Sequence, residues 1–270
     1  MFQDKYVFSQ LTAFLNRTQF NNYVRKYDGN RYVKHFTFWN QMLAMMFGQL
    51  SNRESLRDLI VAFEAHRAKQ YHLGVGREPI AKTTLATANQ NRDYRIFEEF
   101  AFYMMKEACE KRTTNILDIS GKKYAFDSTT IPLCLATFPW AKFRSKKGGV
   151  KAHVLYDIEA QVPALDVTNL YKKRWLIELF FKWLKQHLKI KKFWGTTENA
   201  VRIQISVAII TYSLVAIVQH DMNLKRSTYE VLQILSISLT DKTHLRDLFD
   251  KTNFNDVKDL YDPLIPGLFD

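Results

Sequence analysis

Four chemically active side chains lie at helical spacing between residues 171 and 185. They are the phenol of Tyr171, the guanidinium of Arg174, the carboxylate of Glu178 and the amine of Lys185. If each residue turns the helix by about 100°, all four fall within an arc of about 60°. A carboxylate set among cations is costly unless it meets a metal ion, a phosphate or a paired charge. The pattern therefore predicts a carboxylate that binds a metal ion, beside groups that hold a phosphate.

Two further cations lie beside the arc, and most of the rest of the cylinder is apolar. Those cations are Lys182 and Lys189, and the other positions include Trp175, Phe180 and Trp183. A helix that is apolar nearly all round is usually buried. On spacing alone, a core helix with one solvated basic face explains the pattern equally well, so both interpretations stay open.

A second carboxylate, Asp127, lies in a stretch typical of a β-strand. Residues 123–131 are rich in β-branched and aromatic side chains, and residues 148–157 alternate after a glycine pair. We predict two neighbouring strands, joined by a loop over residues 132–147. Mg²⁺ prefers carboxylate oxygens. We therefore expect Asp127 and Glu178 to hold Mg²⁺ or Mn²⁺, weakly because two carboxylates alone fix a metal poorly.

The charge of the chain indicates a polyanionic partner. Lysine and arginine number 39 against 27 acidic residues, which gives a formal net charge of +12 and a pI near 9.5. Residues 140–195 hold thirteen of the basic residues and only four acidic ones. This segment also contains Trp140 and Trp194, and cations interleaved with aromatic rings favour a nucleic-acid surface. For each tryptophan, stacking on bases and ordinary packing are the two alternatives, and packing is the simpler.

Composition also argues against several other classes of protein. Two cysteines exclude a disulfide scaffold and give no zinc-binding pattern. The first residues lack the features of a signal peptide. The most apolar stretch, residues 207–218, is too short to span a bilayer and is predicted to be a buried helix. We expect a cytoplasmic protein without membrane contact.

Residues 1–112 are predicted to be helical, followed by the strands and then by further helices. Several short helices in this region could form a helix-turn-helix-like DNA-binding unit, and a plain helical bundle is the alternative. A capping box at residues 51–54 is expected to open a helix over 55–67. A long helical region from 83 to 111 should break near residues 89–92.

Two further helix starts are predicted near the C-terminal end. Thr197 is expected to cap an apolar helix that runs to about Gln219. Ser227 and Glu230 form a second capping box. The segment 161–164 is typical of the entry to a third strand.

The chain resembles bacterial insertion-sequence transposases of the IS4 group, which are DDE-type enzymes with a ribonuclease-H-like core. The signature of that group is Tyr, two residues, Arg, three residues, Glu, six residues and Lys, and the four residues from Tyr171 to Lys185 meet it at every step. The stretch from Asp127 to Thr130 resembles the strand that bears the family's first catalytic Asp. Further similarity, to the helical domain that often precedes this core, is spread over residues 49–51, 55–57, 71–74 and 84–89.

The resemblance implies a fold, an activity and a role for each site residue. The implied activity is cut-and-paste DNA transposition with Mg²⁺, at inverted-repeat ends of double-stranded DNA held by a homodimer. Asp127 and Glu178 would be catalytic metal ligands, Tyr171 and Arg174 would hold a phosphate near the transposon end, and Lys185 would contact the same backbone. Lys182 and Lys189 are added as DNA-binding candidates from their place on the helix.

The implied fold is a mixed α/β protein that is predominantly helical. We predict an N-terminal helical domain at 1–112, a truncated ribonuclease-H-like core at 113–222 and a C-terminal helical tail at 223–270. The core is called truncated because Asp127 and Glu178 are only 51 positions apart, which leaves no room for the strand that bears the family's second catalytic Asp. We infer an internal deletion near Ala164 and Leu165.

Such a deletion should affect cleavage more than DNA binding. Asp157 more simply ends a strand and Asp166 more simply caps a helix, so neither is a ready substitute for the missing ligand. We expect a transposase-family protein with impaired strand cleavage. The alternative is a non-catalytic DNA-binding remnant, or an inhibitor of a full-length transposase.

Overall fold

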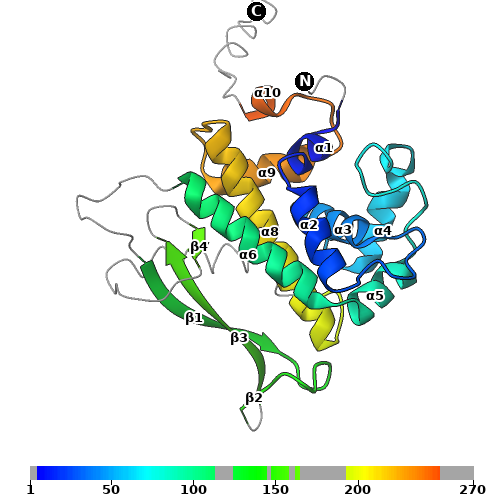
Figure 1. Ribbon diagram of the computed structural model, residues 1–270, viewed down its shortest axis with the longest axis vertical. Helices are drawn as coiled ribbons and strands as arrows, with labels where there is room; N and C mark the ends of the chain where they lie inside the picture. The colour runs from blue at the N-terminus through cyan, green and yellow to red at the C-terminus, as the bar shows by residue number, and fades with distance from the viewer. Residues whose placement is uncertain (1–4, 113–123, 145–146, 158–161, 165–192, 250–270) are drawn as a thin grey trace, which may run out of the picture.

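The computed structural model describes residues 5–112, 124–144, 147–157, 162–164 and 193–249. Within these ranges the protein is predominantly helical, with one antiparallel sheet, which confirms the predicted fold class. Figure 1 shows the sheet extending away from the helical body. The helices, with one 3-10 turn (η1), are α1 (Val7–Thr12), α2 (Arg17–Lys26), α3 (Phe38–Leu50), α4 (Leu56–Ala65), η1 (Arg67–Lys69), α5 (Lys82–Asn91), α6 (Tyr94–Arg112), α8 (Glu198–Asp221), α9 (Thr228–Ser238) and α10 (Leu245–Phe249).

Side-chain caps explain where two of the later helices begin. Thr197 accepts a hydrogen bond from the backbone N–H of Ala200 at the start of α8. Ser227 and Glu230 form a reciprocal capping box at the start of α9. Both caps satisfy backbone donors that a helix start otherwise leaves unpaired, and both predictions are confirmed. The predicted break in the helical region 83–111 is also confirmed, because α5 ends at Asn91 and α6 begins at Tyr94.

The predicted capping box at residues 51–54 is wrong. Ser51 and Asn52 instead form the turn that ends α3, where Asn52 has a φ of 56° and the N–H of Arg53 donates to the carbonyl of Gly48. The cap of α4 is Ser55, whose hydroxyl accepts from the N–H of Asp58 at 3.1 Å. The same polar residues suit a helix end and a helix start, which is why the spacing alone misplaced the cap.

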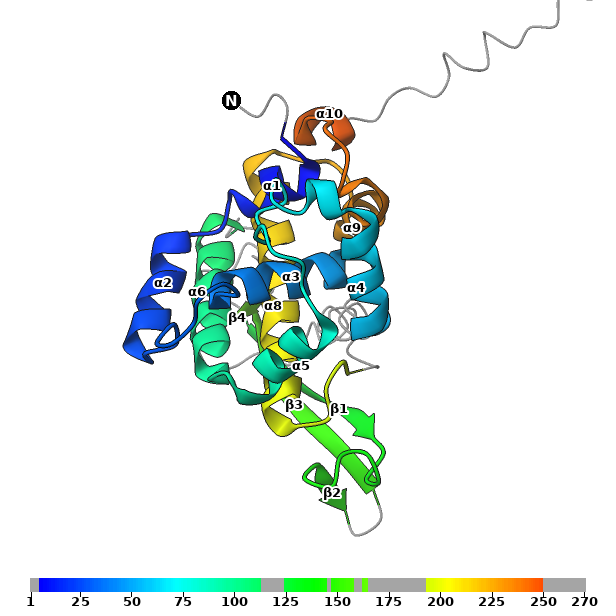
Figure 2. The same cartoon turned by 90° about the vertical axis from the view of Figure 1, so that its right-hand side faces the viewer.

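The core of the helical body is built around α3, α6 and α8. Figure 2 shows α3 crossing between α2 and α4, and its residues are buried on nearly every side. Helices α6 and α8 pack along each other. A single cluster of buried apolar side chains runs from Val7 to Phe249, so helices before and after the sheet contribute to one core. The predicted unit boundaries at 112/113 and 222/223 stay predictions.

Helix α8 has a composition that invites comparison with a membrane span. It is 24 residues long with a mean hydropathy of 2.0 over its most apolar window, and 83% of that window is buried inside the protein. By length and composition it could cross a bilayer, so the predicted apolar segment is longer than the sequence suggested. Its burial against α3 and α6 indicates a core helix.

The sheet confirms the two predicted strands and adds two short ones. Strand β1 (Tyr124–Leu133) pairs antiparallel with β3 (Lys147–Asp157) along its whole length. Strand β2 (Lys142–Arg144) pairs with β3 near Gly148, inside the segment predicted as a loop. Strand β4 (Val162–Ala164) pairs with the other end of β3, which confirms the predicted entry to a third strand. The order is β1-β3-β2, with β4 also on β3.

Candidate functional site

Asp127 lies within β1, as predicted. It is paired with Val154 of β3, and the next residue, Ser128, is paired with His153. The residues before and after Asp127 are also paired with β3. The backbone of Asp127 is therefore fixed in a regular antiparallel register. The strand context expected for a carboxylate ligand is therefore present.

The other predicted site residues lie outside the residues that the structure describes. Their roles stay predictions, and nothing in the structure brings them to Asp127 or separates them from it. These residues are Tyr171, Arg174, Glu178, Lys182, Lys185 and Lys189.

The two tryptophans are packed rather than free. Trp194 is only 8% exposed, and its backbone N–H donates to the side-chain oxygen of Gln204 at 2.8 Å. The indole N–H of Trp140 donates to the carbonyl of Thr196 at 2.8 Å, and its ring meets the edge of Phe138. For Trp194 the packing alternative is confirmed.

A hollow of about 690 Å³ opens between α2, the following turn and the start of α3. We call it the arginine hollow, because Arg17, Arg25 and Arg31 line it, while Asp28 is its one acidic lining residue. Arg17 and Arg25 lie on one side of α2, since eight residues at about 100° each leave the two side chains about 80° apart around the axis. The hollow therefore concentrates positive charge on one side of the helical body.

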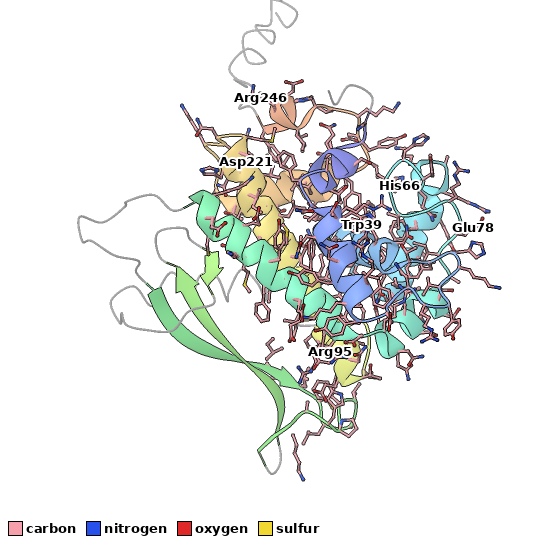
Figure 3. All side chains as sticks on the ribbon, in the orientation of Figure 1. Trp39, His66, Glu78, Arg95, Asp221 and Arg246 are labelled. Carbon is pink, nitrogen blue, oxygen red and sulfur yellow. The ribbon has the colours of Figure 1, made fainter. Side chains whose placement is uncertain are left out.

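The three arginines of this hollow are exposed and make no ion pair within the described part of the chain. The guanidinium of Arg17 lies 5.4 Å from the ring centroid of Trp39, which Figure 3 labels beside α2. Arg31 lies 5.2 Å over the ring of Tyr32. Contacts with rings orient a guanidinium and leave its N–H donors free for an anion.

A second hollow, of about 380 Å³, shares Arg17 and Trp39 with the arginine hollow. Its lining adds the rings of Tyr71 and His72. Arg77 lies 4.6 Å from the centroid of Tyr71, and its hydrogen bond to the phenol lowers the pKa of Tyr71 below its ordinary value. The two hollows thus form a continuous surface of cations and aromatic rings.

Sequence reasoning missed these hollows. A signal was present in the i, i+4, i+8 series of Arg17, Asn21 and Arg25, all polar and all on one face of a predicted helix. Arg31 lies beyond α2, in a turn where the N–H of Gly29 donates to the carbonyl of Val24 and the N–H of Arg31 donates to that of Asp28. The periodicity of the helix does not place it.

Arg92 is a further cation near this region, and its contacts are structural. It donates to the carbonyl of Thr37 at 3.0 Å and to Gln41 Oε1 at 2.9 Å, and also to the carbonyl of Phe36. Burial lowers the pKa of Arg92 to about 10. Its acceptors are all neutral, so this guanidinium ties the turn before α3 to the α5–α6 junction.

The described residues contain no group of three or more His, Cys, Asp or Glu residues placed to hold a metal ion. This finding does not bear on the predicted ligands Asp127 and Glu178, because Glu178 lies outside the described ranges. Both predicted ligands are carboxylates, which suits Mg²⁺ and Mn²⁺ by donor type.

Fold and site together define a basic, predominantly helical protein whose described surface suits a polyanion. Two segments match known families. Residues 158–214 match the transposase DDE domain, and residues 3–76 match a domain of unknown function, DUF4372. The first segment includes Glu178 but not Asp127.

Similarity to curated proteins is local, and those proteins are named as transposases. The chain is 42% identical over 86 residues to a putative transposase y4zB of Sinorhizobium fredii, which is 32% of this chain and 23% of the relative. It is 46% identical over 48 residues to a probable transposase for insertion sequence element IS5377 of Geobacillus stearothermophilus, 18% of this chain and 13% of the relative.

A third match is 50% identical over 46 residues to a putative transposase for insertion sequence element IS4SA of Synechocystis, 17% of this chain and 14% of the relative. The chain thus spans less than a quarter of each of these relatives. No solved structure matches the chain.

Proposed function

We propose that this chain is a DDE-type transposase, or part of one, that binds the DNA ends of an insertion sequence. One observation carries the proposal: residues 158–214 match the transposase DDE domain, and this segment contains the whole series from Tyr171 to Lys185. The names of the three relatives point the same way. Membership of the IS4 group is part of the proposal, supported by the spacing of that series.

Asp127 and Glu178 are the proposed ligands for Mg²⁺ or Mn²⁺. A divalent ion bound there would supply an activated oxygen nucleophile and stabilisation of the leaving oxygen in phosphodiester cleavage. Arg174 and Tyr171 would hold a phosphate by charge-assisted hydrogen bonds. Lys182, Lys185 and Lys189 follow at helical spacing and would track the same backbone.

We further propose that strand cleavage is impaired. Strand β4 ends at Ala164, and in the sequence only residues 165–170 separate it from Tyr171, with Asp166 as their one carboxylate. Catalysis of this type needs groups placed within about half an ångström, and two carboxylates place an ion poorly. This short spacing favours a second candidate function, a DNA-binding remnant that does not cleave.

The partners and compartment of the protein are part of the same proposal. Duplex DNA is supported by the net charge of +12. A homodimer would hold two transposon ends together. The burial of α8 in the helical core supports a cytoplasmic protein rather than one inserted in a membrane.

A nicking assay on supercoiled plasmid tests the proposal. We expect slow nicking with Mn²⁺ and slower nicking with Mg²⁺, and both Asp127→Asn and Glu178→Gln should abolish it. Nicking that survives both substitutions would reject the assigned ligands. Salt-dependent DNA binding without any nicking would favour the remnant, and absence of DNA binding at low salt would reject both candidates.

A further inference from the structure

We infer that the arginine hollow and the adjoining second hollow form a binding track for the phosphate backbone of duplex DNA, made of residues other than the predicted ligands Asp127 and Glu178. The inference rests on the proposed function in one respect, since the ligand is the same DNA. It gives a role to the region that matches only a domain of unknown function, residues 3–76.

The first step is the spacing of the cations. Arg17 and Arg25 are eight residues apart on one face of α2, which is about 12 Å along the helix axis at 1.5 Å per residue. Successive phosphates of one DNA strand rise by about 3.4 Å along the duplex. The two guanidiniums therefore span the rise of roughly three to four nucleotides, and Arg31 adds a third cation from the turn after α2.

The second step is that these cations are available. Arg17, Arg25 and Arg31 are exposed, and none pairs with a carboxylate within the described ranges. Two other arginines of the same body already have partners. Arg95 is paired with Asp93 at 2.6 Å, and Arg92 is committed to backbone carbonyls.

The third step is the shape of the surface. Two hollows of about 690 and 380 Å³ meet at Arg17 and Trp39, so the track is longer than a single phosphate requires. Trp39 is nearly buried and cannot stack on a base, so it positions Arg17 instead. Tyr71, in the second hollow, is 53% exposed and offers a ring face beside the track.

The ligand inferred for the arginine hollow is nucleic acid and not an acidic peptide. The arginine hollow is lined by neutral donors such as Thr18, Asn21 and Asn30, with Val24 as its one aliphatic side chain. Side-chain amides and hydroxyls commonly hydrogen-bond phosphate oxygens. Arginine clusters can also bind acidic peptides. Duplex DNA is the ligand inferred because residues 158–214 match the transposase DDE domain, and an acidic peptide is an outcome of the test.

The test compares DNA binding by the full chain and two double variants, measured by fluorescence anisotropy on a 30-base-pair duplex with EDTA present. Arg25→Gln/Arg31→Gln changes no contact of Trp39, and Arg17→Gln/Arg25→Gln removes both cations of the helix face. Each should raise the Kd about tenfold or more. Each should also lower the slope of log K against log salt by about 1.8, since each phosphate contact contributes about 0.9.

The control is Arg57→Gln, an exposed arginine of α4 outside both hollows. It should leave the slope unchanged and raise the Kd less than threefold. Circular dichroism should show equal helix content and the same melting temperature in all variants, because the substituted side chains are exposed.

Wild-type Kd and salt slope in both double variants would overturn the inference. So would a loss of binding to poly-glutamate with duplex binding intact, which would identify an acidic peptide as the ligand. EDTA removes any divalent ion, so this assay measures DNA binding in the absence of metal-dependent cleavage. Failure of this inference is therefore distinguishable from failure of the proposed cleavage.

Discussion

Gly48 of α3 lies directly against the indole of Trp194. A Cβ atom at Gly48 would lie 2.5 Å from Cη2 of Trp194 and 3.1 Å from a methyl group of Leu59. The segment that follows the predicted Glu178 helix is thereby packed into the N-terminal helices. Glycine is required in the last turn of α3 by this close approach, at the cost of its low helix propensity.

Gly48→Ala should therefore destabilise the protein although alanine is the better helix former. We expect a loss of about 1–3 kcal/mol in the free energy of unfolding, as for overpacked cores, measured by urea denaturation. Trp194→Phe in the same chain should recover part of the loss. An increase in stability on Gly48→Ala alone would show that the indole is not held against α3.

Arg92→Met should destabilise the protein by about 2–3 kcal/mol, because it removes the guanidinium donor from the carbonyl of Phe36 and from Oε1 of Gln41. Thermal or urea denaturation measures the change. The control is Arg57→Met on the surface of α4, expected to stay within about 0.5 kcal/mol of the wild type. Equal stability of the two variants would contradict a structural role for Arg92.

Glu99 should make the stability of the helical body depend on pH in the acid range. Burial alone would raise the pKa of Glu99, but hydrogen bonds from Lys26 and Tyr27 outweigh it and lower that pKa below 4.5. A lowered carboxyl pKa gives stability that is complete above the ordinary pKa and is lost as pH falls through the folded value.

The free energy of unfolding should thus fall more steeply between about pH 5 and pH 3 in the wild type than in Glu99→Gln. Denaturation curves at a series of pH values measure the two slopes. Glu64→Gln, an exposed residue of α4, is the matched control and should keep the wild-type slope. Identical slopes in all three proteins would contradict the assigned pairing of Glu99.

Local chemistry in the sequence was enough to place several elements. Thr197 and Ser227 were correctly predicted as helix caps, because a hydroxyl before a helix satisfies specific backbone donors. Two neighbouring strands were predicted at 123–131 and 148–157 from β-branched composition and a glycine pair, and the structure pairs 124–133 with 147–157. Asp127 was placed in a strand on the same grounds.

Tertiary structure decided what the sequence could not. Ser51 is a residue type typical of a helix start, yet it lies in the turn that ends α3. Strand β2 forms where Lys142 pairs with Gly148 of β3. The three residues of β2 do not predict this pairing by themselves. The hollow formed by Arg17, Arg25 and Arg31 depends on the turn after α2 folding back on the helix.

The central claim is that Asp127 and Glu178 bind one divalent ion together. Mn²⁺ binding to the full chain, followed by electron paramagnetic resonance, tests it most directly. The account predicts one weak site that is lost in Asp127→Asn and in Glu178→Gln, and is retained in Asp157→Asn. Equal Mn²⁺ binding by the wild type and by both ligand variants would contradict it.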